Sequence, residues 1–229
     1  MTLTYDLVFD ADDTLWENNI YFERAFQEFV EFLDHSTLNE VEVRAVLDEI
    51  ELVNNQIHGY GTANFIRNLE QCYRHLVERE IRQDDIDRVM SLAEHILEQP
   101  VELIEGVEET LAELRTRHRL TLFTKGHPDE QRMKIDRSGL AGRFHHTAIV
   151  KEKDAGAYRK LAADFRMEPR STWMIGNSPK SDVNSALEAG LNAVFIPHAH
   201  TWTLERQAVP EPGERLLVLD RFADLVQHF

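Results

Sequence analysis

The chain has 229 residues and a formal net charge of −16, since 41 acidic residues outnumber 25 basic ones. This charge argues against nucleic-acid and anionic-membrane partners, because phosphates and anionic headgroups attract lysine and arginine. With 42% hydrophobic and 29% charged residues, the composition is that of a globular protein, and the length suits one large domain or one domain that carries a smaller second one.

The first predicted element is a short buried strand over residues 5–9, which acidic residues follow. From about residue 20 to residue 99 the apolar residues recur at helical spacing. The apolar runs extend over residues 22–33, 43–57, 65–76 and 86–97. Four amphipathic helices with short connections predict a small helical bundle.

Pro100 and Gly106 mark the return to a different pattern. Strand-like runs then alternate with helix-like ones, and the strands are expected at residues 120–123, 148–150, 173–175, 193–196 and 216–219. Such alternation predicts βαβ units and a mostly parallel sheet with helices on both faces. The expected fold class is α/β: a doubly wound, Rossmann-like core with a helical-bundle insertion after its first strand.

No predicted element is suited to a membrane. The longest purely apolar runs, such as residues 7–9, are far shorter than the ~20 residues that a membrane span needs, and no signal-peptide pattern opens the sequence. We therefore expect a soluble, cytoplasmic protein. Cys72 is the single cysteine, which excludes an internal disulfide bond and a zinc site built from thiolates.

Ligands bind at the carboxyl ends of the strands in an open parallel sheet, so the residues after each predicted strand are candidates for chemistry. After the first strand, Asp10 and Asp12 lie two residues apart, on one side of an extended chain. Such a pair needs a cation or a proton to offset its repulsion, although an acidic loop or helix cap gives the same pattern. After the second strand, Thr124, Lys125 and Gly126 fit either an anion-binding turn or a plain turn.

Two further strand ends carry polar residues. Lys151 and Lys153 follow the third strand, where solvated lysines are the simplest interpretation. Asn177 and Asp182 follow the fourth strand and offer the hard oxygen ligands that suit Mg²⁺, with helix capping as the competing interpretation. Each signal alone is weak. Four strand ends that supply, in order, the parts of one phosphoryl-transfer site favour a functional site over four unrelated turns and caps.

These strand ends resemble the four motifs of the haloacid dehalogenase superfamily. The motifs are, in order, VFDADDTLW with Asp10, Asp12 and Thr14, LTLFTKG with Thr124, Lys153 five residues before Tyr158, and MIGNSPKSDVNSALEAG with Asn177 and Asp182. The resemblance covers residues 1–15 and about 101–229, which we expect to form an α/β core domain. Residues 16–100 resemble the helical cap domain that many family members carry after the first motif.

The resemblance implies a mechanism of in-line attack. Asp10 would be the nucleophile that forms an aspartyl-phosphate, and Asp12 would act first as general acid and then as general base. The implied cofactor is Mg²⁺, held by Asp10, the backbone carbonyl of Asp12, Asn177 and Asp182. The phosphoryl oxygens would be held by Thr124, the N–H groups of Lys125 and Gly126, and the ammonium group of Lys153.

The expected function is that of a Mg²⁺-dependent phosphatase acting on a small phosphorylated metabolite. Asp12 argues for phosphate chemistry, because the dehalogenases of the family lack this second acid. The fourth motif usually begins with aspartate, and Asn177 in its place would weaken the binding of Mg²⁺ unless Asp182 coordinates directly. The alternatives are a 2-haloacid dehalogenase and a catalytically weak relative that binds a phosphorylated ligand.

Three assignments in the sequence rest on local pattern alone. Lys153 is preferred to Lys151 as the third-motif lysine because of its spacing to Tyr158. In the cap, Tyr60 is flanked by glycines and is expected either in a substrate-binding loop that reaches over the site or in a plain interhelical turn. The histidines at positions 198 and 200 alternate after the fifth strand, but no third ligand lies near them in the sequence, so they are expected to line the entrance of the site.

Overall fold

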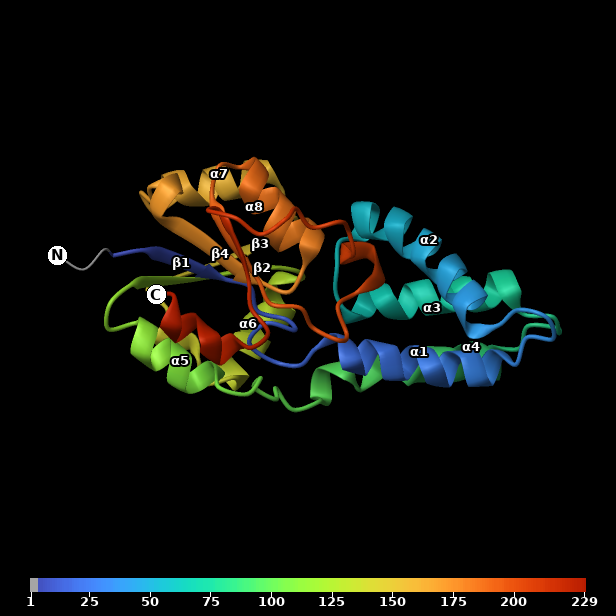
Figure 1. Ribbon diagram of the computed structural model, residues 1–229. Helices are drawn as coiled ribbons and strands as arrows, with labels where there is room; N and C mark the ends of the chain where they lie inside the picture. The colour runs from blue at the N-terminus through green and yellow to red at the C-terminus, as the bar shows by residue number, and fades with distance from the viewer. Residues whose placement is uncertain (1–3) are drawn as a thin grey trace. The chain divides into compact units, whose positions relative to one another are not determined.

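A sheet of six parallel strands forms the centre of the α/β part of the computed structural model, which describes residues 4–229 (Figure 1). The strand order is β3-β2-β1-β4-β5-β6. The strand bounds are β1 (Asp6–Phe9), β2 (Arg119–Lys125), β3 (His146–Val150), β4 (Thr172–Gly176), β5 (Asn192–Phe195) and β6 (Leu216–Val218). Each strand predicted from the sequence is present, and the doubly wound α/β fold is confirmed.

Helices cover both faces of this sheet, as Figure 1 shows. The helices of the α/β part are α5 (Val107–Leu114), α6 (Pro128–Arg137), α7 (Ala155–Asp164) and α8 (Ser185–Glu188). Side chains alternate along β1, so that Leu7 and Phe9 pack in one apolar cluster with α5, while Val8 packs in another with α7 and α8. Strand β1 is thus buried on both faces, as expected for the middle of a parallel sheet.

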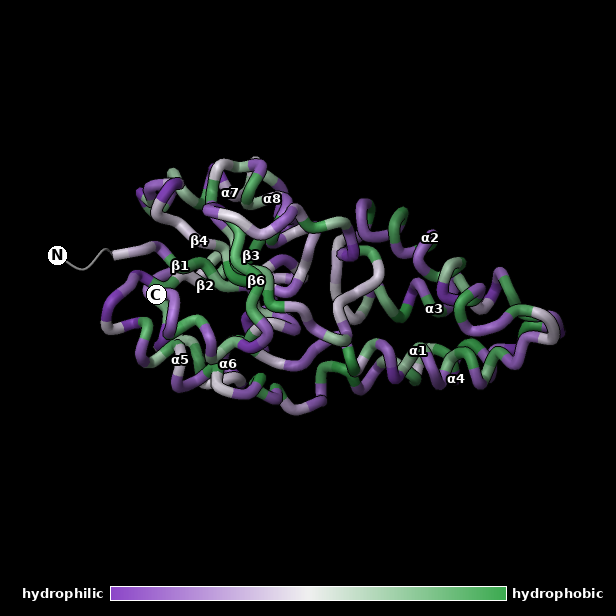
Figure 2. Tube along the Cα trace, viewed as in Figure 1, coloured by the Kyte–Doolittle hydropathy of each residue, from purple (hydrophilic) through white to green (hydrophobic). Residues whose placement is uncertain are grey.

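The described chain divides into two compact units. One unit contains the residues up to Asn18 and Val101–Phe229, and the other is Asn19–Pro100. The second unit holds α1 (Asn19–Leu33), α2 (Glu40–His58), α3 (Thr62–Leu76) and α4 (Gln83–Glu94), which confirms the four helices predicted there. Figure 2 shows the alternation of polar and apolar residues along these helices, whose apolar sides form a core of their own.

Capping residues set the start and the end of helix α2. Asn39 caps the start of α2: its side chain accepts hydrogen bonds from backbone N–H groups of the first turn, while Glu42 bonds back to the Asn39 N–H. After α2, the φ angles of Gly59 and Gly61 are +77° and +124°, values that favour glycine. These two glycines place Tyr60 in the short connection between α2 and α3.

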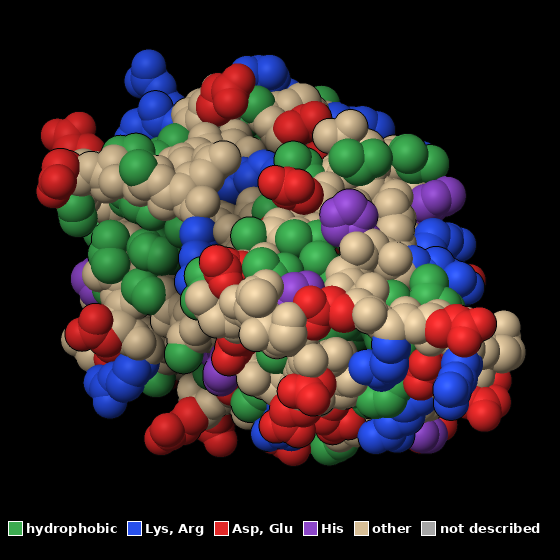
Figure 3. Space-filling view, turned by 90° about the vertical axis from the view of Figure 1, so that its right-hand side faces the viewer, with side chains coloured by type: hydrophobic (Ala, Val, Ile, Leu, Met, Phe, Trp, Pro, Cys, Tyr) green, Lys and Arg blue, Asp and Glu red, His purple; other side chains and the backbone are tan. Residues whose placement is uncertain are grey.

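Charged side chains are distributed over the surface. On the face that Figure 3 shows, basic side chains stand in small groups among acidic ones. Within residues 4–229, no helix has the length and apolar character required to pass through a lipid bilayer.

Candidate active site

The strand order places a topological switch point at the carboxyl end of the sheet. In the order 3-2-1-4-5-6 the winding direction reverses between β1 and β4, and ligands bind at such a switch point. Asp10 directly follows β1 and Asn177 directly follows β4. The register of the two strands pairs Phe9 with Ile175, and the Asp10 N–H donates to the Ile175 carbonyl oxygen over 2.9 Å. The two motif loops therefore start side by side.

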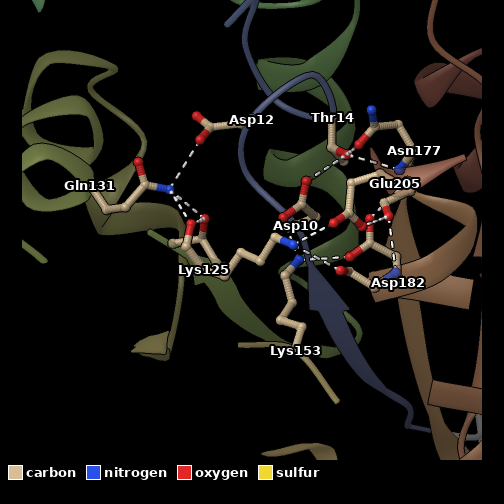
Figure 4. Close-up of polar contacts among 12 residues, drawn as sticks. Asp10, Asp12, Thr14, Lys125, Gln131, Lys153, Asn177, Asp182 and Glu205 are labelled. Atoms are coloured by element: carbon tan, nitrogen blue, oxygen red, sulfur yellow. Dashed lines mark hydrogen bonds and ion pairs between the residues drawn. The ribbon is translucent and has the colours of Figure 1, made fainter. Parts of the chain in front are cut away.

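Lys153 joins the carboxylates of Asp10 and Asp182 (Figure 4). Its ammonium group donates to Asp10 Oδ1 and, over 2.6 Å, to Asp182 Oδ1. All three side chains are buried, with exposed fractions of 10% or less. Lys151, in contrast, is exposed. The structure thus brings Lys153, rather than Lys151, to the carboxylates.

Burial and charge together set the proton affinities of this group. Burial and repulsion from Asp10 raise the pKa of Asp182 to about 7, against the opposing attraction of Lys153. For Lys153, burial lowers the pKa, but the attraction of Asp10 and Asp182 outweighs it and raises the pKa overall. Two carboxylates facing one ammonium group leave an excess of negative charge that suits a bound cation.

Thr14 and Thr201 orient Asn177. Thr14 Oγ1 lies 3.1 Å from Asp10 Oδ2 and 3.2 Å from Asn177 Oδ1, and it accepts a hydrogen bond from the Asn177 backbone N–H. The Asn177 side-chain amide donates to Thr201 Oγ1 over 3.1 Å. Because the amide nitrogen is engaged by Thr201, the carbonyl oxygen of Asn177 is directed toward Thr14 and Asp10.

The loop after β4 places the Asp182 side chain next to Gly176 at the end of that strand. Asp182 lies in the short helical segment η4 (Pro179–Asn184), and its Oδ2 accepts a hydrogen bond from the Ser178 N–H over 3.0 Å. A Cβ added to Gly176 would come within 2.2 Å of this same oxygen. Glycine at position 176 therefore leaves the space that the Asp182 carboxylate fills.

Asp12 points away from Asp10, toward helix α6, as Figure 4 shows. Its carboxylate oxygens lie 2.6 and 2.7 Å from Lys134 Nζ. Gln131 Nε2 lies 3.1 Å from Asp12 Oδ2 and also donates to Thr124 Oγ1, at the end of β2. Asp12 and Thr124 are thus linked to each other through one side chain of α6.

Comparison with known protein families assigns this chain to one of them. A model of the haloacid dehalogenase-like hydrolase family matches residues 7–190. The chain belongs to the haloacid dehalogenase-like hydrolases. This family assignment confirms the resemblance seen in the motifs.

Individual relatives of this hydrolase include phosphatases. Human N-acylneuraminate-9-phosphatase is 25% identical over 215 residues, which cover 88% of this chain and 86% of that protein. Phosphoserine phosphatase from Thermus thermophilus is 36% identical over 95 residues, but the match spans only 39% of this chain and 38% of that relative. The crystal structure of a haloacid dehalogenase-like family hydrolase from Xanthomonas campestris has a TM-score of 0.83 and 27% identity, with 100% of this chain and 96% of that chain covered.

The structure changes one expectation about the second motif of the hydrolase and adds a partner for Lys125. The Gly126 N–H was expected to bind substrate, but it donates to the Val150 carbonyl oxygen over 3.1 Å, because the pairing of β2 with β3 extends one residue past the strand. The Lys125 ammonium group is paired with Glu205, a buried residue that sequence reasoning missed, and lies 3.1 Å from Ser181 Oγ. Burial would raise the pKa of Glu205, but Lys125 and hydroxyl donors lower it overall.

His198 of the hydrolase does have ligating neighbours, which come from a distant part of the sequence. Its ring nitrogens lie 3.4 Å from Glu17 Oε2 and 3.9 Å from Asp13 Oδ1, and one ligand atom of each residue lies within 4.8 Å of the others. His200 does not belong to this group. We expected no third metal ligand near these histidines. That is true of the neighbouring sequence, but in the folded structure Asp13 and Glu17 lie beside His198. His198 is held between two carboxylates that are separate from the Asp10 and Asp182 pair.

The remaining predicted residue of the hydrolase, Tyr60, belongs to the helical unit. It lies in the connection between α2 and α3, where the sequence placed it. Its substrate-binding role stays a prediction.

Proposed function

We propose that this hydrolase is a Mg²⁺-dependent phosphatase that cleaves a small phosphorylated metabolite through an aspartyl-phosphate intermediate. One observation carries the proposal: Asp10, at the switch point of the sheet, is held by Lys153 and faces Asp182, while a second acid, Asp12, stands two residues away. The phosphatases among its relatives support the same reaction class.

The proposed reaction has two displacements at phosphorus. In the first, an Asp10 carboxylate oxygen forms a bond to phosphorus, and the bond to the leaving oxygen breaks as protonated Asp12 gives that oxygen a proton. In the second, water attacks phosphorus while Asp12 takes its proton, and the bond between phosphorus and Asp10 breaks. Inorganic phosphate leaves, and Asp10 and Asp12 return to their starting states.

The residues at the strand ends fit Mg²⁺. Asp10, Asp182 and the carbonyl of Asn177 are hard oxygen ligands, and the two carboxylates share the ammonium group of Lys153. These residues, with the Asp12 backbone carbonyl, would hold the ion. When bound, Mg²⁺ would offset the repulsion between Asp10 and a dianionic phosphate.

The phosphoryl oxygens would be held by Lys153, the Thr124 hydroxyl and the Lys125 backbone N–H. The Lys125 ammonium group has a structural role in this proposal, because its pairing with Glu205 ties β2 to the segment after β5. Gly126 forms the turn after β2, where its φ of +148° favours glycine, and its N–H group is already bonded to the Val150 carbonyl oxygen.

The test uses purified protein and p-nitrophenyl phosphate. Hydrolysis should require Mg²⁺, should be lost with a chelator, and should be lost in Asp10→Asn. Full activity of Asp10→Asn would overturn the nucleophile assignment, and halide release from a 2-haloacid without Mg²⁺ would overturn the proposed reaction. A panel of phosphorylated sugars, nucleotides and acids then identifies the substrate, while thermal stabilisation by such ligands without turnover would indicate a binding protein.

A further inference from the structure

The Asp12 carboxylate is surrounded by donors. Lys134 Nζ contacts Oδ1 over 2.6 Å and Oδ2 over 2.7 Å, Trp16 Nε1 donates to Oδ1 over 2.8 Å, and Gln131 Nε2 lies 3.1 Å from Oδ2. A carboxylate has about four lone-pair positions, so these contacts account for all of them. A general acid with this many partners has one defined orientation.

The donors on Oδ1 are firmly anchored. Trp16 is 1% exposed, and its ring belongs to the apolar cluster beneath the sheet, so its N–H has little freedom to turn elsewhere. Lys134 lies one turn after Gln131 on α6, and its ammonium group also donates to Asn18 Oδ1 over 3.0 Å. The Lys134 side chain is only 15% exposed, which reduces competition from water.

The Gln131 contact with Oδ2 is replaceable. Its side-chain nitrogen has two protons but lies near three acceptors: Asp12 Oδ2, Thr124 Oγ1 and the Lys125 carbonyl oxygen. It can therefore bond fully to only two of them at a time. Oδ2 is the Asp12 oxygen that can exchange a partner for a substrate without breaking an anchored contact.

We propose that Lys134 is a positioning residue for the phosphatase reaction. Lys134 contacts both oxygens of Asp12 and Trp16 holds Oδ1, so that the carboxylate presents Oδ2 to the leaving oxygen of the substrate once Gln131 gives way. The inference rests on the proposed function, because it assigns a purpose to the orientation of the general acid. Proton transfer depends on hydrogen-bond geometry, so a misdirected Asp12 would lose its catalytic contribution.

The decisive experiment compares two leaving groups. A p-nitrophenolate ion leaves without a proton, whereas an alkoxide needs one, so only alkyl phosphate cleavage depends strongly on Asp12. In Lys134→Met, kcat/KM should fall roughly 10²-fold for an alkyl phosphate and much less for p-nitrophenyl phosphate. Equal losses on the two substrates would overturn the proposal. Arg132→Met removes an exposed cation from the same helix and should change neither value.

A double-variant comparison tests whether Lys134 acts through Asp12. In an Asp12→Asn background, adding Lys134→Met should cause no further loss of alkyl phosphate cleavage, measured in single turnovers. Multiplying losses would show that Lys134 acts on the substrate by another route and would contradict the proposal.

Failure of the proposed function can be distinguished from failure of this inference. If the wild-type protein cleaves no phosphate ester, the phosphatase proposal falls, and crystal structures of the wild type and Lys134→Met then decide the role of Lys134. The Asp12 carboxylate should leave hydrogen-bond distance of Trp16 Nε1 in the variant. An unmoved Asp12 would show that Lys134 does not position it.

Discussion

The Asp182 carboxylate fills the space that a side chain at Gly176 would require: an added Cβ would lie 2.2 Å from Asp182 Oδ2. Gly176→Ala should therefore displace Asp182 while leaving β4 in place. We expect activity to fall by about 10²-fold, because a shift of about 1 Å in a catalytic group has an effect of that size. Mg²⁺ affinity, measured by calorimetry, should fall with it. Gly142→Ala is the matched control, since no heavy atom lies within 4 Å of its added Cβ.

Removing Lys153 should affect both activity and stability. Lys153→Met leaves Asp10 and Asp182 buried without their ammonium partner, and we expect activity to fall by roughly 10²- to 10³-fold. The free energy of unfolding should fall by about 3 kcal/mol in the presence of a chelator, and Mg²⁺ should restore part of it. Urea unfolding with and without Mg²⁺ measures both effects. Lys151→Met should behave as the wild type, because Lys151 is exposed; loss of turnover in that variant alone would reverse the assignment.

Metal binding should release a proton at acidic pH. In the metal-free protein the pKa of Asp182 is raised to about 7, so below this pH the carboxyl group carries a proton that must leave before a cation binds. Mg²⁺ affinity should therefore rise by up to about tenfold per pH unit as the pH approaches 7 from below, and level off above it. Calorimetry at pH 6 and pH 8, in buffers of different ionisation enthalpy, measures the released proton. Equal proton release at both values would contradict this assignment.

The pair formed by Lys125 and Glu205 should stabilise the fold in a pH-dependent manner. The pKa of Glu205 is lower in the folded protein than its ordinary value of 4.5, so the ionised side chain stabilises the folded state above that value. This stabilisation is lost as the pH falls through the folded pKa. Glu205→Gln should lower the free energy of unfolding by about 2 kcal/mol at pH 7, and the difference from the wild type should narrow below pH 4.

An exposed ion pair provides the control for that experiment. Lys160 and Asp164 lie one turn apart on α7, and both side chains are more than half exposed. Asp164→Asn should change the free energy of unfolding by less than about 0.5 kcal/mol at either pH. A comparable loss in both variants would show that burial of Glu205 does not determine its effect.

The fold could be predicted because the apolar patterns of the strands and of the helices are both distinct in this sequence. Short apolar runs located all six strands, and helical periodicity located the four helices of residues 19–100. The strand ends also predicted which side chains would meet. Carboxyl ends of neighbouring parallel strands lie at one edge of the sheet, which is why Asp10, Lys153 and Asp182 come together.

The partners of these residues were not predictable in the same way. Gln131 and Lys134 share one face of α6, but their contact with Asp12 depends on how that helix packs beside the loop after β1. Glu205 lies ten residues after the end of β5, in a segment without periodicity, so its pairing with Lys125 had no local signal. The Gly126 N–H was misassigned because the sequence does not reveal how far strand pairing continues.

The placement of two rare residue types gives the molecule a pair of built-in reporters. All three tryptophans, Trp16, Trp173 and Trp202, lie in the α/β unit, whereas the single cysteine, Cys72, lies in the helical unit. Cys72 is fully buried, and its burial raises the pKa of the thiol to about 12, so it should react with thiol reagents only when the helices open. Fluorescence and thiol labelling of the unmodified chain therefore follow the two units separately. Their midpoints in denaturant will tell whether both units unfold in one step.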